Sequence, residues 1–405
     1  MKVLQAALGA LAVLAAVLLV VFVHSTRPAE PGAFYSPPTP LPGGPLGTIV
    51  RSERVADAPA GARERRILYI STSFTGARTA VSGLLFVPTT AAPPGGRPIA
   101  VSTHGTIGVA SGCVGSKLGP AYWPAIDGLK QFLAAGYVVA APDYQGLGTP
   151  GPHPYLVGDS EAWAALDAAR AARRFAAAGA GERFAVFGAS QGGQAALFTG
   201  QLAAAYAPEL KLVGVAAAAP ASDLARLFAN NPNSTVTRVL SAYTLDTWSQ
   251  VYPQLKARQV ATAVSLPVIE RIAGLCIGID EKSTISAAVV AQLLRISYLH
   301  KKPWETEPWK SLIARNSPGL ERIPAPVLIT QGDEDKLVTP EITSAFVAGL
   351  CRRGQTVSLR TYPGVDHVHA GPQTAPDVAG WIDARFRGQS TPTGCRATRS
   401  TASVQ

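Results

Sequence analysis

The sequence is poor in charged residues and shows no low-complexity bias. Only 15% of its 405 residues are charged, whereas 47% are apolar, and an average globular protein is about 25% charged. Its 39 glycines and 33 prolines stay below the roughly 25–30% that is typical of low-complexity chains. This composition excludes an intrinsically disordered protein and predicts a packed hydrophobic core.

The sequence also lacks a concentrated basic patch. Lys and Arg number 36 against 26 Asp and Glu, which gives a net charge of +10. The basic residues occur as scattered pairs such as Arg65-Arg66 and Arg352-Arg353, and not as the runs of about 5–8 that bind polyphosphates. We therefore expect a solvated basic surface and no nucleic-acid partner.

The N-terminal segment predicts export. Lys2 precedes an apolar stretch at residues 3–23 that only Gln5 interrupts, and as a helix this stretch would span ~31 Å, close to the bilayer core of ~30 Å. Cleavage after a Val-x-Ser sequence ending at Ser25 would make residues 1–25 a signal peptide. Retention would make them a single-span membrane anchor. Both alternatives predict a secreted or extracytoplasmic protein, and the second also predicts membrane contact.

Cysteine is scarce but even in number. Cys113, Cys276, Cys351 and Cys395 predict disulfides in an exported chain, with three possible connectivities. No two of them have the C-x₂₋₄-C spacing of a zinc site. We therefore expect neither a metal site nor a cofactor.

Beyond a Pro- and Gly-rich arm at residues 26–48, apolar runs of strand length alternate with Ala-rich helical segments. This alternation predicts an α/β fold whose mainly parallel sheet carries helices on both faces. The core would comprise residues 49–221 and 318–390, with a tail at 391–405. Residues 222–317 show helical segments at 236–252 and 284–299, a Trp-bearing stretch and no strand, which predicts a helical cap inserted over the C-terminal strand ends. The expected strands cover 67–73, 79–87, 99–102, 137–141, 184–187, 212–216, 327–330 and 357–361, and the expected core helices cover 161–178 (with Ser160 as N-cap), 191–205, 341–352 and 375–386.

The strongest motif is Gly-Ala-Ser-Gln-Gly at 188–192, directly after an apolar strand and before a helix. G-x-S-x-G in this setting is a nucleophile elbow, a tight turn that exposes a serine hydroxyl above the sheet edge. Glycine is needed on both sides because a side chain there would collide with the neighbouring elements. The motif predicts Ser190 as a nucleophile.

A serine nucleophile needs a base and an acid that orients the base, and in this fold they follow the serine in the order acid, then histidine. The loop after strand 327–330 offers Asp335 as the acid, with Asp333 as the alternative. The loop after strand 357–361 offers His367 as the base, with His369 as the alternative.

Two backbone donors should stabilise the oxyanion of an acyl-transfer reaction. The N–H of Gln191 is supplied by the start of the helix after the elbow, and the loop after strand 99–102 supplies a second. There, Gly105 allows close approach, so Thr106 is the expected donor. His104 precedes Ser190 in the chain, which favours a structural role.

Together these motifs resemble the secretory lipase family of α/β-hydrolases. The resemblance includes His-Gly-Thr at 104–106, Pro-Asp-Tyr-Gln-Gly-Leu-Gly at 142–148 and His-Pro-Tyr-Leu at 153–156, besides the elbow and the acid and histidine loops. It implies an α/β-hydrolase fold with a helical cap, and lipid esters, including triacylglycerols, as substrates. It also implies the disulfides Cys113–Cys276 and Cys351–Cys395.

The hypothesis is ester hydrolysis through an acyl-enzyme formed on Ser190. An acyltransferase with the same three residues would pass the acyl group to another alcohol instead of water. A protein of a different class, a non-catalytic lipid-binding envelope protein on the same fold, is the third alternative.

Overall fold

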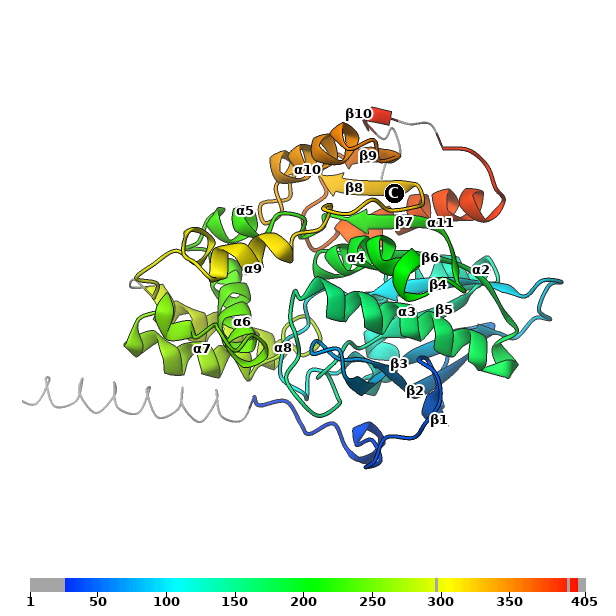
Figure 1. Ribbon diagram of the computed structural model, residues 1–405, viewed down its shortest axis with the longest axis horizontal. Helices are drawn as coiled ribbons and strands as arrows, with labels where there is room; N and C mark the ends of the chain where they lie inside the picture. Colours follow the sequence, from blue (N-terminus) through cyan, green and yellow to red (C-terminus); the bar gives the residue numbers. More distant parts are fainter. Residues whose placement is uncertain (1–25, 296–297, 392–393, 400–405) are drawn as a thin grey trace, which may run out of the picture.

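The computed structural model describes residues 26–295, 298–391 and 394–399, and a mixed, mostly parallel sheet runs through its centre (Figure 1). In the described residues the strand order is β1-β2-β3-β5-β4-β6-β7-β8-β9-β10. The pairs β1–β2, β2–β3 and β3–β5 are antiparallel, and all later neighbours are parallel. The strands are β1 (Ile49–Arg54), β2 (Ala62–Thr72), β3 (Arg78–Pro88), β4 (Arg97–Thr103), β5 (Val138–Pro142), β6 (Ala180–Ala189), β7 (Lys211–Ala218), β8 (Val327–Gly332), β9 (Val357–Tyr362) and β10 (Gly394–Arg399). The predicted α/β-hydrolase sheet is confirmed.

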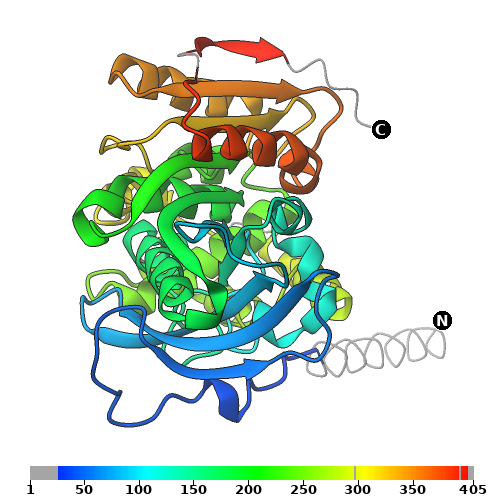
Figure 2. The ribbon, with the colours of Figure 1, turned by 90° about the vertical axis from the view of Figure 1, so that its right-hand side faces the viewer.

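Helices cover both faces of this sheet (Figure 2). One face carries α3 (Gly158–Arg174), α4 (Gln191–Tyr206) and α10 (Pro340–Arg352), and the other carries α2 (Leu129–Ala134) and α11 (Ala370–Phe386). The parallel strands between these layers are apolar almost throughout: β5 and β8 are buried over their whole length. A strand with helices on both sides meets no water, which explains why these strands do not alternate between apolar and polar residues.

A second group of helices lies between β7 and β8. It comprises α5 (Leu224–Ala229), α6 (Thr235–Val251), α7 (Leu266–Ala273), α8 (Glu281–Ala291) and α9 (Trp309–Arg315). These helices pack around their own hydrophobic cluster, in which the rings of Trp248 and Trp309 stack with centroids 6.2 Å apart. The described residues of 222–317 form no strand, only isolated bridges, as the sequence predicted.

The arm at residues 26–48 wraps against the core. Tyr35, in a 3₁₀ turn at Ala33–Tyr35, is 2% exposed and shares a hydrogen bond of 2.9 Å with the Ser116 hydroxyl. The predicted signal or anchor at residues 1–25 lies outside the described residues. Among those that are described, no helix is long and apolar enough to cross a membrane.

Several element boundaries differ from the expectation. Helix α3 begins at Gly158 rather than after a Ser160 N-cap. Ser160 lies within the first turn, and its hydroxyl donates to the Gln145 side chain. Helix α11 begins at Ala370, five residues earlier than predicted. The charged edge strand β1 and the C-terminal β10 were not predicted, because each is a strand through its pairing with another strand, β2 or β9, and has no strand pattern of its own.

Candidate active site

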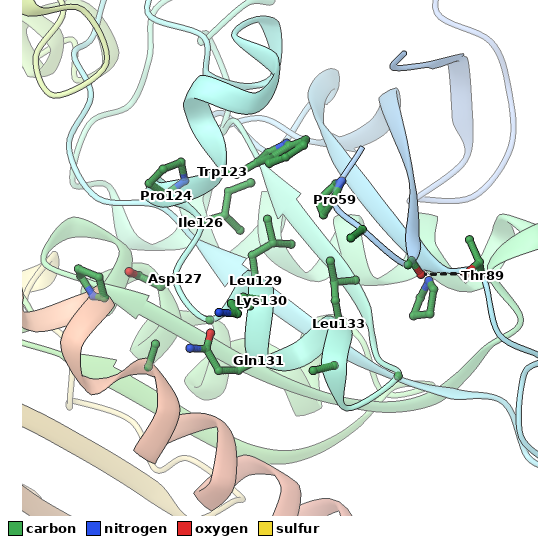
Figure 3. A pocket seen from close by; sticks show the side chains of 18 of the residues that line it. Pro59, Thr89, Trp123, Pro124, Ile126, Asp127, Leu129, Lys130, Gln131 and Leu133 are labelled. Atoms are coloured by element: carbon green, nitrogen blue, oxygen red, sulfur yellow. Dashed lines mark hydrogen bonds between the residues drawn. The ribbon is translucent and has the colours of Figure 1, made fainter. Parts of the chain in front are cut away.

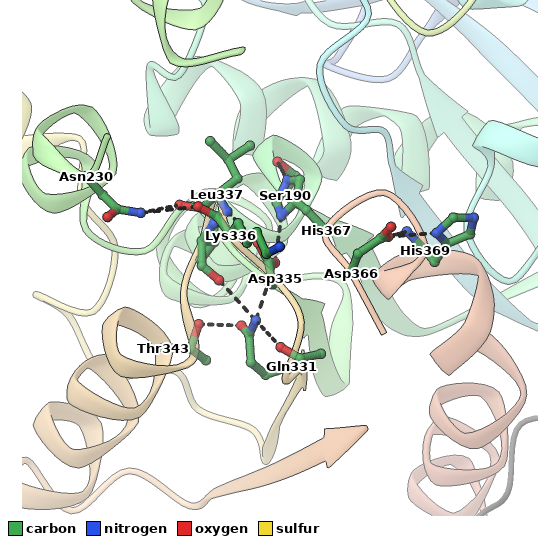
Figure 4. A network of polar contacts seen from close by, with 12 residues as sticks. Ser190, Asn230, Gln331, Asp335, Lys336, Leu337, Thr343, Asp366, His367 and His369 are labelled. Atoms are coloured by element: carbon green, nitrogen blue, oxygen red, sulfur yellow. Dashed lines mark hydrogen bonds and ion pairs between the residues drawn. The ribbon is translucent and has the colours of Figure 1, made fainter. Parts of the chain in front are cut away.

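Ser190 occupies the turn between β6 and α4 (Figure 4). Its backbone adopts φ 57° and ψ −118°, a strained conformation for a residue with a side chain. A Cβ atom on Gly188 or Gly192 would lie 2.3 or 2.0 Å from the carbonyl oxygen of Thr103. Only glycine therefore allows the turn to pass this close to β4, and the turn raises the serine side chain above the sheet edge.

A chain of hydrogen bonds joins Ser190, His367 and Asp335 (Figure 4). Ser190 Oγ lies 2.9 Å from His367 Nε2, and His367 Nδ1 lies 2.7 Å from Asp335 Oδ2. Asp335 follows β8 and His367 follows β9, so the carboxyl ends of parallel strands bring the three side chains together. Because a carboxylate only accepts, Nδ1–H donates to Asp335 and Nε2 is left to accept the serine proton.

The Asp335 carboxylate is held by its own loop. It is 2% exposed, and its Oδ1 accepts hydrogen bonds of 2.9 Å from the backbone N–H groups of Leu337 and Val338. The Gln331 amide donates to Oδ2 at 3.3 Å. These donors satisfy a buried charge that would otherwise be costly, and they aim Oδ2 at the imidazole.

The two alternative residues lie elsewhere. Asp333 accepts the Gly364 N–H at 2.7 Å, a turn-stabilising bond at the surface. The exposed His369 pairs with Asp366 at 2.7 Å instead of with Ser190 (Figure 4). Of these four candidates, Asp335 and His367 are the two that the described hydrogen bonds join to Ser190.

The loop after β4 lies against the elbow. A Cβ atom on Gly105 would be 3.4 Å from the Ala189 carbonyl and 4.0 Å from Ser190 Cβ, so the chain at Thr106 passes close to the nucleophile. Gln191 is the first residue of α4, where backbone N–H groups have no intrahelical acceptor. The roles of Thr106 and Gln191 as oxyanion donors stay predictions.

The His104 side chain is buried, and its ring contacts backbone carbonyl groups. Its ring nitrogens lie 2.7 and 3.2 Å from the carbonyl oxygens of Gly105 and Asp143, and burial lowers the pKa of the imidazole. These contacts agree with a structural role.

No sequence pattern predicted a polar cluster behind the elbow. The Gln191 side chain, 1% exposed, donates from Nε2 to Glu161 Oε1 at 2.7 Å and lies 3.4 Å from His153 Nε2. Burial raises the pKa of Glu161 to about 8 and lowers that of His153 to about 3. Gln191 is 30 positions from Glu161 and 38 from His153. His153 lies in the His-Pro-Tyr-Leu motif of the resemblance, but nothing in the sequence connected it or Glu161 with the Gln191 side chain.

A cavity of about 810 Å³ lies beside α2 rather than above Ser190 (Figure 3). Its walls are mainly apolar, with Trp123, Ile126 and Leu133 among the lining residues, and Asp127 lies at its edge next to α11. Burial raises the pKa of Asp127 to about 7. The cavity does not include the serine, so it does not define the acyl site.

The described residues hold no cluster of His, Cys, Asp and Glu that could bind a metal ion. The four cysteines form the disulfides Cys113–Cys276 and Cys351–Cys395, the pairing that the resemblance implies. The first joins the segment after the Thr106 loop to the helical group between β7 and β8.

Comparison with known protein families and curated proteins gives consistent matches. The family model for secretory lipase matches residues 127–394. Lipase 2 of Candida albicans is 26% identical over 286 residues, which cover 66% of this chain and 59% of that protein. A protein of Mycobacterium tuberculosis (strain CDC 1551 / Oshkosh) named probable inactive lipase MT1628 is 25% identical over 389 residues, 90% of this chain and 84% of that protein.

Solved structures give the same fold. Candida antarctica lipase A superimposes with a TM-score of 0.75 at 18% identity, covering 93% of this chain and 91% of that one. A mutant of the rice cell wall degrading esterase LipA from Xanthomonas oryzae reaches a TM-score of 0.69 at 19% identity, covering 86% and 100%.

Proposed function

Since the chain belongs to the secretory lipase family, we propose that it is a serine hydrolase that cleaves carboxylic esters of lipids through an acyl-enzyme. The observation that carries the proposal is the hydrogen-bond chain from Ser190 through His367 to Asp335, with distances of 2.9 and 2.7 Å. An activated serine requires a base at hydrogen-bond distance and an acid that orients this base, and His367 and Asp335 lie in these positions relative to Ser190.

In the first half of the reaction Ser190 Oγ attacks the ester carbonyl while His367 Nε2 takes the serine proton. Asp335 stabilises the imidazolium that forms, and the N–H groups of Gln191 and Thr106 stabilise the tetrahedral oxyanion. The imidazolium then gives its proton to the leaving alcohol. In the second half a water molecule, deprotonated by His367, attacks the acyl-enzyme, and the acid leaves as Ser190 regains its proton.

The helices between β7 and β8 and the N-terminal segment have proposed roles as well, in acyl-chain binding and in export. We propose that residues 222–317 form a cap that binds the acyl chain next to Ser190. The two disulfides and the apolar stretch at residues 3–23 support an extracytoplasmic location, where disulfides persist.

Ser190→Ala tests the proposal. It should abolish hydrolysis of p-nitrophenyl butyrate and p-nitrophenyl octanoate, whereas Ser311→Ala, which removes an exposed hydroxyl of α9, should hydrolyse both at the rate of the unmodified chain. Activity of Ser190→Ala near that of the unmodified chain would reject Ser190 as the nucleophile.

One relative favours a second candidate function. Because the mycobacterial protein is named a probable inactive lipase, a non-catalytic lipid-binding protein is the alternative for this chain. A fluorophosphonate probe distinguishes the two, since it reacts only with an activated serine. Rapid labelling that Ser190→Ala abolishes would support the hydrolase, and absence of labelling in the folded protein would support the alternative.

A further inference from the structure

The side chain of Gln191 is held from two sides, although its expected role in catalysis uses only its backbone. Its Nε2 donates to Glu161 Oε1, at 2.7 Å, and lies 3.4 Å from His153 Nε2. Glu161 comes from the first turn of α3, and His153 from the loop before it. Two segments outside the elbow thus converge on the residue that follows the nucleophile.

The hydrogen-bond directions in this cluster are determined. His153 Nδ1 lies 2.9 Å from the Gln145 carbonyl oxygen, which can only accept, so Nδ1 carries the hydrogen. Burial keeps the ring neutral, with a pKa of about 3, and Nε2 is therefore an acceptor. Glu161 Oε1 already accepts the Leu156 N–H at 3.1 Å. Both N–H bonds of the Gln191 amide then have an acceptor, whereas a flipped amide would place its oxygen against His153 Nε2, which is itself an acceptor.

A glutamate at position 161 destabilises the folded protein. It is 1% exposed, and its Oε2 is a buried atom without a hydrogen-bond partner among the described residues. An unsatisfied buried carboxyl oxygen destabilises a fold, and an apolar side chain of similar size would avoid that cost. Packing alone therefore does not explain Glu161, whereas a need to hold Gln191 does.

We propose that Glu161, supported by His153, is a positioning residue that fixes Gln191 so that its backbone N–H faces the oxyanion. The inference rests on the proposed hydrolase function. The neighbouring Ser190 has a strained backbone, and such strain persists only when the surrounding contacts oppose relaxation. The Glu161–Gln191 hydrogen bond is one of those contacts, and its loss would let the first residue of α4 rotate away from the reacting carbonyl.

The test uses Glu161→Leu and Gln191→Leu in the full chain. We expect kcat for p-nitrophenyl butyrate to fall about 10- to 100-fold in each, below the 10²–10³-fold that removal of a whole oxyanion donor costs, with KM within about twofold. Affinity for a trifluoromethyl ketone, which mimics the tetrahedral oxyanion, should fall by the same factor as kcat. The double variant should be no worse than either single one, because both remove the same contact.

Two further variants complete the design. Glu161→Gln keeps a carbonyl oxygen for the Gln191 and Leu156 donors and should restore most of kcat. Asp159→Leu removes a half-buried carboxylate two residues away that pairs with Arg315, and it should leave kcat and ketone affinity unchanged.

The results distinguish a failure of this inference from a failure of the proposed hydrolase function. If Glu161→Leu and Gln191→Leu lower the melting temperature but leave kcat and ketone affinity unchanged, the inference is wrong and the proposed function stands. If Glu161→Leu does not fold, Gln191→Leu decides alone, since it retains the carboxyl. If the unmodified chain neither hydrolyses the ester nor reacts with a fluorophosphonate, the proposed function fails, and the inference fails with it.

Discussion

The sheet and the helices between β7 and β8 contribute to the candidate site in different ways. Ser190, His367 and Asp335 all follow strands of the sheet, and hydrogen bonds of 2.7–2.9 Å join them. The helical group reaches the surrounding loops through Asn230, which donates to the carbonyls of residues 336 and 337, and through Cys276. The sheet therefore holds the three side chains together, whereas the helical group contacts the loops beside them.

Asp335→Asn should have the largest effect on kcat, because it changes the hydrogen bond that orients His367. An amide can present its N–H to the imidazole and favour the tautomer in which Nε2 carries the hydrogen, so that His367 no longer accepts the serine proton. We expect kcat to fall by about 10⁴-fold, measured with p-nitrophenyl butyrate.

Asp333→Asn is the matched control on the same loop. Its carboxylate accepts only a turn N–H of Gly364 among the described contacts, and kcat should stay within about twofold of the unmodified chain, since an amide oxygen can accept the same bond. If instead Asp333→Asn lost activity and Asp335→Asn kept it, the assignment of the acid would be reversed.

The two disulfides offer a second way to sharpen the comparison. The Cys113–Cys276 bond closes a separation of 163 residues and the Cys351–Cys395 bond one of 44, and the chain-entropy relation gives about 5 and 4 kcal/mol of stability for them. Their effects on stability should therefore be similar. Only the first lies beside the predicted oxyanion loop, where Gly108 pairs with Cys276 and the Ile277 N–H donates to Ile107.

We therefore expect the double variant Cys113→Ala/Cys276→Ala to lose about tenfold in kcat at a temperature where it is still folded, since a displaced oxyanion donor is costly. Cys351→Ala/Cys395→Ala should keep its kcat and lose only stability. Thermal unfolding and ester hydrolysis, measured on both variants, provide the check. Equal kcat in the two variants would show that the helical group does not hold the Thr106 loop.

One buried carboxyl group in each region should make stability depend on pH, and the pH range should extend higher for the group in the core. The pKa of Glu161 in the core is raised to about 8, and that of Asp246 on α6 to about 6, in both cases mainly by burial. The folded protein then keeps a proton that the unfolded chain has lost, so stability falls as pH rises from the ordinary carboxyl pKa to the folded pKa.

Relative to Glu161→Gln, the unmodified chain should lose stability as the pH rises to about 8. Relative to Asp246→Asn, it should lose stability as the pH rises to about 6. Urea unfolding of the unmodified chain and both variants between pH 4 and 9 measures the two windows. A difference between Glu161→Gln and the unmodified chain that did not change with pH would mean that the pKa of Glu161 is the same in the folded and the unfolded protein.

Short sequence patterns predicted the structural features that depend on residues close together in the chain. The Gly-Ala-Ser-Gln-Gly turn needed only the strand before it and the helix after it, and the parallel sheet followed from apolar runs between helical segments. The meeting of Glu161, His153 and Gln191 depends on how α3 packs against α4, which no short pattern contains. The edge strand β1 was missed for a related reason: its charged residues form a strand only because β2 pairs with them.

Asn230→Ala should have the smallest effect, and it tests whether the helical group influences the acid loop. Asn230 ends α5 and donates to the carbonyls of Lys336 and Leu337 at 3.3 Å, long bonds at a partly exposed site that contribute about 0.5–1.5 kcal/mol to stability. The two N–H groups that hold Asp335 come from within its own loop, so the carboxylate should keep its position when Asn230 is lost. We expect kcat for p-nitrophenyl butyrate to change less than about twofold and the melting temperature to fall by a few degrees at most. A tenfold loss of kcat would mean that the helical group helps to fix the acid, and the division of roles between the two regions would then be wrong.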